Sequence, residues 1–439
     1  MKLPTSQSYG MISLLPKGEK DRYYLENWRP PTMLSCAYKL MSRCIANRLN
    51  TALPKLIHKD QNGFVPGRTI HESLRNTQDI IDHTIKNNKT GVMLLVDFKK
   101  AFDSISHKYI YRVLHKFGFP EYIIRWVTIL IGDYYVSTMN GGRISRRFRL
   151  KRGCKQGDPI SSAIFILSIE ILCEKLRNSP ILKGLSYGIG EILLSLFADD
   201  MTIFLEHSEE QLREAIRIID DFKKLSGLQL QLQKTQITTF GKTPDVNILC
   251  PEIKLQRRPD FKLLGVNFDV NKNITPMEEA NLLQKVEDKA KHWSYRMLTP
   301  MGRCEAARTF LMSQLNHYHA VRPILCNTRD KLDTVVKNFI NPIRKGKKKA
   351  HIYINASDAQ ADKNNGGINM PSIQKSLHSY NVGWLKKLYY KQNEDLHWIH
   401  ILQKDLNKYR RGFKLKWLFQ LSIDEYKSLS KSDNFNNPF

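Results

Sequence analysis

The order of apolar and polar residues in the middle of the chain predicts a sheet of short strands. Residues 91–98 form an almost unbroken apolar run, which is typical of a buried strand. Residues 195–198 and 201–205 are two more apolar segments, and only Asp199 and Asp200 separate them. This pattern predicts a β-hairpin with two adjacent carboxylates at its tip. Adjacent Asp residues also occur in ordinary turns, so the pair alone does not define a functional site.

Segments with helical periodicity flank these strands on both sides. Apolar residues at helical spacing predict helices over residues 34–53, 69–86, 106–114, 121–131, 160–176 and 208–225. We expect Pro54 to end the first helix and Gly227 to cap the last. Further strands are predicted at residues 11–15, 136–139, 148–150, 228–240 and 261–268, with a hairpin turn at 140–142. From residue 276 onward the pattern is helical, so the sequence predicts an α+β fold followed by an all-α region.

The charge of the chain indicates a polyanionic partner. The 439 residues include 69 Lys and Arg against 42 Asp and Glu, a formal net charge of +27. Residues 281–439 hold 28 of the basic and 13 of the acidic residues, so about half of the excess lies in the helical region. Such an excess is typical of nucleic-acid-binding proteins, and a ribosome-like or membrane-surface role is the alternative.

The cysteines and the apolar runs bear on the cellular setting. Seven Cys residues at irregular spacing, with no Cys-x-x-Cys, argue against a zinc site or a disulfide framework and favour a reducing, intracellular setting. The N-terminal residues lack the apolar core of a signal peptide. No run of about 18 apolar residues predicts a membrane span.

A third carboxylate gives the Asp199–Asp200 pair a chemical meaning. Asp97 lies near the end of the apolar run at 91–98, and a strand there can lie beside the predicted hairpin. Three carboxylates on adjacent strands suit two Mg²⁺ ions, because Mg²⁺ prefers hard oxygen ligands. Such an ion pair activates an attacking oxygen and stabilises a leaving oxygen at phosphorus. We therefore expect these three carboxylates to converge within reach of one cation.

A series of blocks in fixed order resembles one protein family. The blocks are LLPKGEKDRYYLENWRP (14–30), QNGFVPGRTIHESL (61–74), LLVDFKKAFDSISH (94–107), GCKQGDPISSAIFILSIEIL (153–172), LFADD (196–200), SGLQLQLQKTQ (226–236), FKLLGVNFD (261–269) and GGINMPS (366–372). Together they are similar to the reverse transcriptases of LINE-type (non-long-terminal-repeat) retrotransposons. No nicking endonuclease precedes the first block, so the chain resembles a fragment of such an element that lacks the endonuclease.

The resemblance implies an RNA-directed DNA polymerase with a right-hand architecture. Residues 1–90 would form fingers, 91–275 a palm with an antiparallel sheet and a fingers insertion near 108–152, and 276–343 a helical thumb. Residues 344–439 would form a basic linker and a helical C-terminal region. The implied reaction extends a primer 3′-hydroxyl on an RNA template with deoxynucleoside triphosphates, using two Mg²⁺ ions for which Mn²⁺ can substitute. The implied location is the nucleus.

The same resemblance assigns metal-binding and nucleic-acid-binding positions. Asp97, Asp199 and Asp200 match the catalytic acids, and Phe98 would supply a backbone carbonyl to the second metal. Leu264 and Gly265 lie in the stretch that matches the primer-grip strand pair and would contact nucleic acid. For Asp103, a helix N-cap is the favoured interpretation over a metal ligand, and for His317 and His319 a structural role is favoured over metal binding.

The nucleotide-binding positions that the resemblance implies are Arg29, Arg68, Phe102, Gln156, Gly157 and Lys234. Arg29 and Arg68 would clamp triphosphate oxygens, for which the bidentate guanidinium is suited. Phe102 would exclude a ribose 2′-hydroxyl, and Gln156 would pack on the nascent base pair. Lys234 would neutralise the pyrophosphate leaving group. Ordinary alternatives stay open: surface side chains for Arg29, Arg68 and Lys234, a loop residue for Gln156, and a core residue for Phe102.

Three positions depart from the pattern of the family. The family usually has an aliphatic residue in place of Pro31, Asn in place of Gln231 and Tyr in place of Leu263. These departures put details of the fingers and primer grip in doubt, but they leave the acids intact. Two rival functions remain at this stage: an RNA-binding, maturase-like protein that does not polymerise, and an inactive truncated relic. The intact acids argue against the first, because a pure binding protein does not need three buried carboxylates.

Overall fold

The computed structural model describes residues 3–4, 6–18, 21–132, 134–187, 190–242, 249–270, 275–341, 356–391, 396–409, 415 and 418. The chain divides into two units. The sheet unit comprises Met1–Ser73, Thr84–Tyr187 and Glu191–Arg258, and the helical unit comprises Leu74–His83, Gly188–Gly190 and Pro259–Phe439. Among the described residues, no helix is long and apolar enough to cross a membrane.

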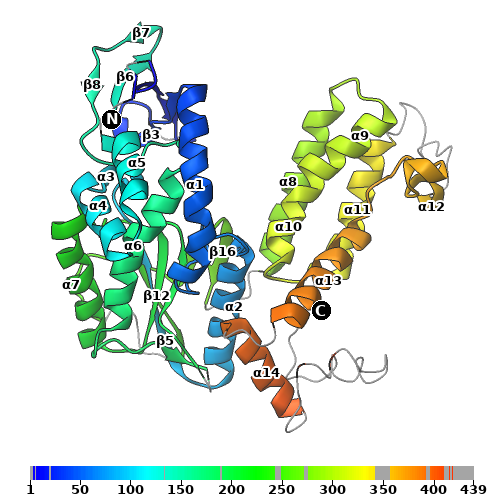
Figure 1. The fold of residues 1–439 in the computed structure, drawn as a ribbon. Coiled ribbons are helices and arrows are strands. Elements are labelled where there is room, and N and C mark those ends of the chain that lie inside the picture. Colours follow the sequence, from blue (N-terminus) through cyan, green and yellow to red (C-terminus); the bar gives the residue numbers. More distant parts are fainter. Residues whose placement is uncertain are drawn as a thin grey trace. The chain divides into compact units, whose positions relative to one another are not determined.

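A five-stranded sheet forms the centre of the sheet unit (Figure 1). Its strands, in spatial order, are β11 (Leu194–Phe197), β12 (Asp200–Leu205), β5 (Thr90–Val96), β13 (Gln236–Gly241) and β14 (Gln256–Arg257). All neighbours are antiparallel except β13 and β14. The apolar run that the sequence predicts as a buried strand is therefore the central strand, with hydrogen bonds to neighbours on both sides.

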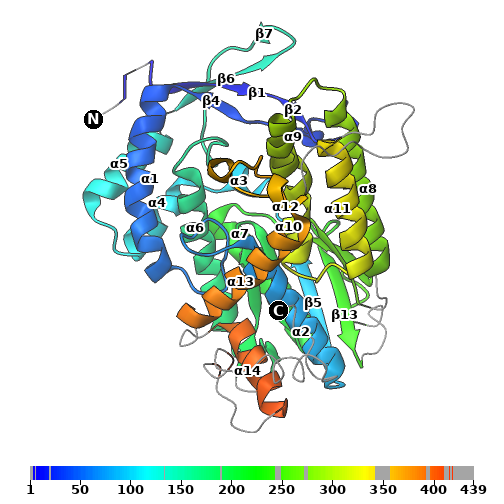
Figure 2. The ribbon, with the colours of Figure 1, turned by 90° about the vertical axis from the view of Figure 1, so that its right-hand side faces the viewer.

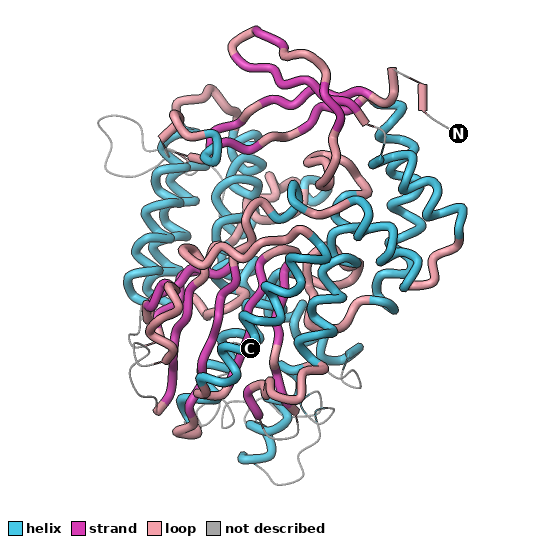
Figure 3. The backbone as a smooth tube through the Cα atoms, turned by 90° about the vertical axis from the view of Figure 1, so that its left-hand side faces the viewer, coloured by secondary structure: helices cyan, strands magenta, loops and turns pink. Residues whose placement is uncertain are grey.

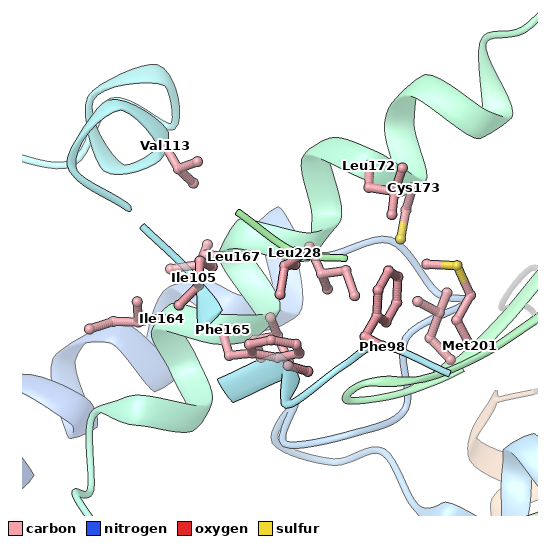
Figure 4. Packing of buried hydrophobic residues seen from close by; sticks show 14 of the residues in the cluster. Phe98, Ile105, Val113, Ile164, Phe165, Leu167, Leu172, Cys173, Met201 and Leu228 are labelled. Carbon is pink, nitrogen blue, oxygen red and sulfur yellow. The ribbon is translucent and has the colours of Figure 1, made fainter. Parts of the chain in front are cut away.

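Helices cover this sheet and bury its apolar side chains. They include α4 (His107–Lys116), α6 (Ser161–Arg177) and α7 (Glu209–Ser226). Helix α6 is buried over most of its length, since its sequence is apolar on nearly every face. Figure 4 shows Phe165, Leu172 and Cys173 of α6 beside Phe98 and Met201 of the sheet region. The position of Phe98, and with it that of the neighbouring Asp97, is therefore set by the main hydrophobic core.

A second sheet lies apart from the central one in the same unit, at the top of Figure 3. It contains β4 (Thr32–Leu34), β1 (Tyr9–Ser13), β6 (Tyr135–Asn140), β7 (Arg143–Ile144) and β8 (Phe148–Arg149). Strands β1 and β6 pair in parallel although they are far apart in the sequence. The predicted turn at 140–142 leads from β6 into β7, a short strand that the sequence did not predict, and β8 also pairs with β6. The remaining elements of this unit are the 3-10 helix Leu25–Asn27, β2 (Leu15–Pro16), β3 (Trp28–Arg29), α1 (Cys36–Leu56), α3 (Ala101–Ser104), α5 (Glu121–Gly132), β9 (Leu185–Ser186) and β10 (Glu191–Ile192).

In the part of the helical unit that the structure describes, the elements are helices and one hairpin (Figure 2). Its elements are β15 (Asp260–Leu263), β16 (Val266–Asp269), α8 (Thr275–Ser294), α9 (Pro300–Ala306), the π-helix Ala307–Met312, α10 (Ser313–His319), α11 (Cys326–Ile340), α12 (Ala356–Ala359), the 3-10 helix Lys363–Asn365, α13 (Ile373–Lys391) and α14 (His397–Tyr409). Helices α8 to α11 share one hydrophobic core with the start of α13. Helix α2 (Ile70–Lys86) contributes its middle part to this unit.

The structure confirms the α+β class and corrects several element boundaries. Pro54 lies inside α1, which continues to Leu56, and the Ile57 N–H still donates to the Leu53 oxygen. Residues 228–235 form a loop and a turn, so only the last part of the predicted 228–240 strand is a strand. Residues 261–268 are two strands of a hairpin, as the resemblance to a strand pair implies. The start of the expected basic linker, residues 344–349, lies outside the described residues.

Candidate active site

The two adjacent acids lie at the tip of a tight hairpin, as predicted. Phe197 pairs with Asp200 across β11 and β12, so Ala198 and Asp199 alone form the turn. Ala198 has a φ of 59°, a left-handed conformation that an L-residue with a Cβ atom seldom adopts. The apolar strands on each side of the turn are buried, which fixes the place of the acids.

The third acid reaches the same place through the register of the central sheet. Met201 of β12, the residue after Asp200, pairs with Val96 of β5. Asp97 is the next residue after Val96, so the pairing brings it to the end of the hairpin that carries the other two acids. The main-chain oxygen of Asp97 accepts a hydrogen bond from the Gln231 nitrogen at 2.8 Å. The main-chain nitrogen of Asp97 donates to the Thr235 hydroxyl at 3.3 Å. The loop before β13 therefore holds Asp97 by its backbone.

All three carboxylates border one cavity of about 380 Å³. Its lining residues are Lys17, Glu26, Arg29, Val96, Asp97, Phe98, Lys99, Lys100, Ala101, Asp199, Asp200, Gln231 and Lys234. The wall thus combines the three acids and Glu26 with several Lys residues and one Arg. Such a composition suits a ligand that carries negative charge next to bound cations. Of the predicted nucleotide-binding residues, Arg29 and Lys234 belong to this wall.

The acids are electrostatically coupled to one another. Partial burial raises the pKa of Asp199, and Asp97 raises it further. Burial raises the pKa of Asp200 to about 6, with further contributions from Asp199 and Asp97. Both shifts arise first from burial and then from the neighbouring carboxylates, so the ionised acids are disfavoured while no cation is bound. A cation that binds there would remove this cost.

The carboxylates do not form a closed metal site. Among the described residues, no three His, Cys, Asp or Glu side chains lie close enough together to hold one metal ion. The expectation that the three carboxylates converge within reach of one cation is therefore not met by their side-chain placement. The three acids and Phe98 line the same cavity, and carboxylate oxygens are the ligand type that Mg²⁺ prefers.

The glycine-rich loop at 153–159 lies against α3 and is not among the residues that line the cavity. Cys154 donates its main-chain N–H to the Phe102 oxygen at 2.7 Å, and the Phe102 ring stacks on Phe165 with ring centroids 4.2 Å apart. The Gln156 amide contacts the Asp103 carboxylate at 3.3 Å. Gly157 has a φ of 99°, which favours glycine. The roles predicted for Phe102, Gln156 and Gly157 stay predictions.

The N-cap interpretation of Asp103 is wrong. Asp103 lies within α3, and the N-cap position of that helix is Lys100, with a φ of 48°. The Asp103 side chain instead accepts the contact from Gln156, and burial raises the pKa of its carboxyl. The physical reason is that the chain enters α3 from a left-handed residue, so no side chain caps its first turn.

A buried ionic network holds the 153–159 loop, and the sequence analysis missed it. The Lys155 ammonium lies 3.5 Å from the Asp158 carboxylate, and both side chains are almost completely buried. The ammonium also lies over the rings of Tyr38 and Tyr134, 4.4 and 3.6 Å from the ring centroids. Asp158 accepts further hydrogen bonds from the hydroxyls of Tyr38, at 2.6 Å, and Ser42. The available signal was a Lys and an Asp within a loop that leads into a very apolar helix.

Arg68 has a different environment from the one predicted. Its guanidinium donates hydrogen bonds to the main-chain oxygens of Ile57, His58 and Gln61, at 2.8, 2.5 and 2.7 Å. It is not among the described residues that line the cavity of the acids. Arg68 therefore stabilises the 57–61 loop through hydrogen bonds to its main chain. The predicted contact of Arg68 with triphosphate stays a prediction.

The predicted nucleic-acid-binding turn belongs to the helical unit. Leu264 and Gly265 connect β15 and β16 with φ values of 48° and 90°. The His317 ring on α10 hydrogen bonds to the Leu264 oxygen, and Arg322 donates to the Asn267 oxygen at 3.2 Å. These contacts explain why the hairpin groups with the helices, although residues up to 275 are expected to belong with the central sheet. His317 and His319 both have structural partners, the latter Asn381.

Comparisons with known proteins identify the family. Residues 15–268 match the family model described as "Reverse transcriptase (RNA-dependent DNA polymerase)". The chain is 30% identical over 267 residues to the retrovirus-related Pol polyprotein from type-1 retrotransposable element R2 of Popillia japonica, covering 60% of this chain and 36% of that protein. It is 24% identical over 398 residues to the transposon TX1 uncharacterized 149 kDa protein of Xenopus laevis, covering 89% and 29%.

Among solved structures, the telomerase from Candida albicans in complex with a fragment of telomeric RNA is similar with a TM-score of 0.47 and 10% identity, covering 96% of this chain and 66% of that one. The family assignment rests on the sequence match alone. The chain spans about a third of the length of the relatives named above. With residues 15–268 matched over more than half of its length, this chain belongs to the reverse transcriptase (RNA-dependent DNA polymerase) family.

Proposed function

We propose that this chain is an RNA-directed DNA polymerase that extends a primer 3′-hydroxyl on an RNA template. The observation that carries the proposal is the set of three carboxylates, from the β11–β12 turn and the end of β5, on one cavity wall. Their place in the fold follows from strand register and from the buried strands that carry them. The family match supports the same reaction.

The acids supply the donor type that two divalent cations would need. Asp97, Asp199 and Asp200 would supply carboxylate oxygens, and Phe98 would supply its carbonyl. When bound, Mg²⁺, or Mn²⁺ in its place, would lower the barrier to attack at phosphorus by stabilising the attacking and leaving oxygens. The residues contribute by placing their negative charge on a buried scaffold, because a misplaced ligand costs much of the catalytic effect.

The basic residues around the acids suit the triphosphate of a deoxynucleotide. Arg29 is exposed on β3 and Lys234 is exposed in the turn before β13, and both border the cavity. Lys17 and Lys100 add positive charge on the same wall. Their charges would orient the phosphates and neutralise the pyrophosphate that leaves. Phe102 would restrict the sugar, since its ring is held against Phe165.

The helical unit would hold the RNA–DNA hybrid. About half of the excess positive charge lies beyond residue 280, and phosphate contacts of this kind need no sequence readout. In functional terms, residues 1–90 and the insertion near 108–152 would be fingers, 91–275 palm and 276–343 thumb. The Leu264–Gly265 turn would contact the primer. The template, primer and nucleotide are part of the proposal, as is a nuclear location.

The direct test is primer extension by the purified 439-residue chain. We expect deoxynucleotide incorporation on an RNA template in the presence of Mg²⁺, and we expect Asp199→Asn to reduce it by at least a thousandfold. Asp221→Asn is the matched control. It removes a carboxylate on the exposed face of α7, where its ion pair with Lys224 contributes little. Circular dichroism should show that both variants stay folded.

Other outcomes would favour the rival functions. A folded chain that binds the hybrid without extending any primer would indicate a maturase-like binding protein. A folded chain that neither binds nor extends would indicate an inactive relic. Extension by Asp199→Asn at the wild-type rate would overturn the catalytic assignment itself.

A further inference from the structure

A short segment of the sheet unit runs along the hairpin that carries two of the acids. Asn62 donates its main-chain N–H to the Leu196 oxygen, and Leu196 donates to the Asp60 oxygen, both at 2.8 Å. Gln61 and Leu196 thereby form an isolated parallel bridge. The 60–62 segment acts as one more strand next to β11. It ends beside the turn at Ala198.

The side chain of Gln61 continues this pairing where the backbone cannot. Its oxygen accepts the Ala198 main-chain N–H at 2.8 Å, and its amide nitrogen contacts the Ala198 oxygen at 3.3 Å. The same oxygen accepts the Gly63 N–H at 2.8 Å. Gln61 is 1% exposed, so water does not compete for these bonds. One amide thus pairs with both main-chain groups of the residue that precedes Asp199.

Ala198 needs such support because of its conformation. Its φ of 59° lies in the left-handed region, which is unfavourable for an L-residue with a Cβ atom. In a two-residue hairpin turn, glycine usually occupies a position with positive φ. A strained residue persists only where its surroundings determine its conformation. The two hydrogen bonds between the Gln61 side chain and the Ala198 main chain hold Ala198 in this conformation.

The segment that carries Gln61 is itself tightly held. Arg68 binds the Gln61 main-chain oxygen at 2.7 Å. Asp60 contacts the Arg177 guanidinium at 3.3 Å. A Cβ atom at Gly63 would lie 2.2 Å from the Ala198 nitrogen, so only glycine allows the backbone to pass this close to the turn. Gln61 is therefore fixed against the hairpin from both sides.

We propose that Gln61 is a positioning residue for the catalytic hairpin: its side-chain amide holds the strained Ala198 turn and thereby orients the Asp199 carboxylate toward the shared cavity. Gln61 touches no reacting group in this arrangement, and it acts through the main chain of Ala198. The inference rests on the proposed polymerase function for its catalytic consequence. Its structural part, the clamp on Ala198, stands on the geometry alone.

The test uses Gln61→Met in the full chain, since methionine has nearly the volume of glutamine but makes neither hydrogen bond. Hydrogen exchange at the Ala198 amide, read by mass spectrometry with fragmentation of the 194–203 segment, should become at least tenfold faster, because a buried N–H loses its acceptor. In primer extension we expect kcat to fall about tenfold or more. The KM for the deoxynucleotide should stay within about twofold, as for a residue that orients a catalytic group.

Gln211→Met is the matched control, because Gln211 is also a buried glutamine whose oxygen accepts a main-chain N–H, that of Lys183 at 3.1 Å. It should change neither Ala198 exchange nor kcat. Gln61→Glu keeps the acceptor oxygen and should retain slow exchange at the Ala198 amide. If Gln61→Met does not fold, this variant still tests whether the acceptor oxygen protects that amide. In an Ala198→Gly background, Gln61→Met should cost at least fivefold less in kcat, since glycine adopts positive φ without help.

The outcomes separate the clamp from the function. Unchanged Ala198 exchange in Gln61→Met would overturn the inference even if the chain polymerises. An equal loss of kcat in the wild-type and Ala198→Gly backgrounds would also overturn it, because the effect would then not pass through turn strain. If the wild-type chain does not polymerise, the proposed function fails, and the exchange measurement alone still decides whether Gln61 holds the turn.

Discussion

The buried pair of Lys155 and Asp158 offers a stability test that can be worked from the structure. The charged atoms lie 3.5 Å apart, and both side chains are at most 2% exposed. At an effective dielectric constant of about 20, two unit charges at this distance attract by about 5 kcal/mol. Removing one partner of a buried pair typically costs about 3–5 kcal/mol, because the other charge stays buried.

We expect Lys155→Met to lower the free energy of unfolding by about 3 kcal/mol, at the lower end of this range. The lower end applies because the Asp158 carboxylate would still accept hydrogen bonds from the hydroxyls of Tyr38 and Ser42. It would also keep a weak contact from the Ile160 nitrogen at 3.4 Å. The double variant Lys155→Met with Asp158→Asn should recover more than half of the loss, because no charge is then buried. Urea unfolding followed by circular dichroism measures all three proteins.

The pH dependence sharpens this test. Burial lowers the pKa of Lys155 to about 8, against an opposing contribution from Asp158. At Lys155 the unfolded chain therefore binds more protons than the folded chain above about pH 8, so the contribution of this residue to the free energy of unfolding should rise with pH in this range. In Asp158→Asn the pKa of Lys155 should fall further. The loss of unfolding free energy in this variant, relative to the wild type, should therefore become smaller between about pH 7 and pH 9. Two results would refute the reasoning. One is a double variant as unstable as Lys155→Met. The other is a stability difference between Asp158→Asn and the wild type that does not change with pH.

Two further predictions concern the site itself. Phe102→Val should raise the GTP-to-dGTP ratio of kcat/KM by roughly a hundredfold; equal loss for both nucleotides would reduce Phe102 to a packing residue on Phe165. Because the pKa of Asp200 is raised to about 6, the cation-free chain should lose stability as pH rises through that value. Mg²⁺ should therefore raise the Tm at about pH 7.5 more than at about pH 5, and Asp200→Asn should reduce the difference between the two pH values, while Asp199 keeps its own raised pKa.

The parts of the fold that local patterns specify were predictable from the sequence. The 91–98 run and the two segments around Asp199 and Asp200 are apolar over several consecutive residues, and tertiary contacts did not override them. The alternation of leucines with polar residues at 228–235 predicts a strand where the structure has a loop. Its backbone instead turns to hydrogen bond with the Asp97 oxygen through Gln231. That contact joins residues far apart in the sequence and has no local signal.

The roles of polar side chains were harder to predict than the elements. Arg68 and Gln61 lie in a block that resembles the family, but the sequence does not show that Arg68 binds main-chain oxygens or that Gln61 faces Ala198. Both contacts depend on where the 57–63 loop crosses the hairpin. Lys155 likewise looks like a surface residue until two tyrosines, distant in sequence, enclose it. Long-range polar contacts of this kind require the fold.

The strand order of the central sheet has a consequence for how the chain folds during synthesis. Strand β5 is the central strand, yet β12 and β13 follow it only after a long stretch of sequence. At about 5–20 residues per second, a ribosome would need roughly 5–20 s to complete β12 after β5. During that time an apolar strand has neither of its partners, and closing such long loops is slow. Nascent chains should therefore depend on chaperones until β12 has emerged, and the folding of the acid site should be a late event.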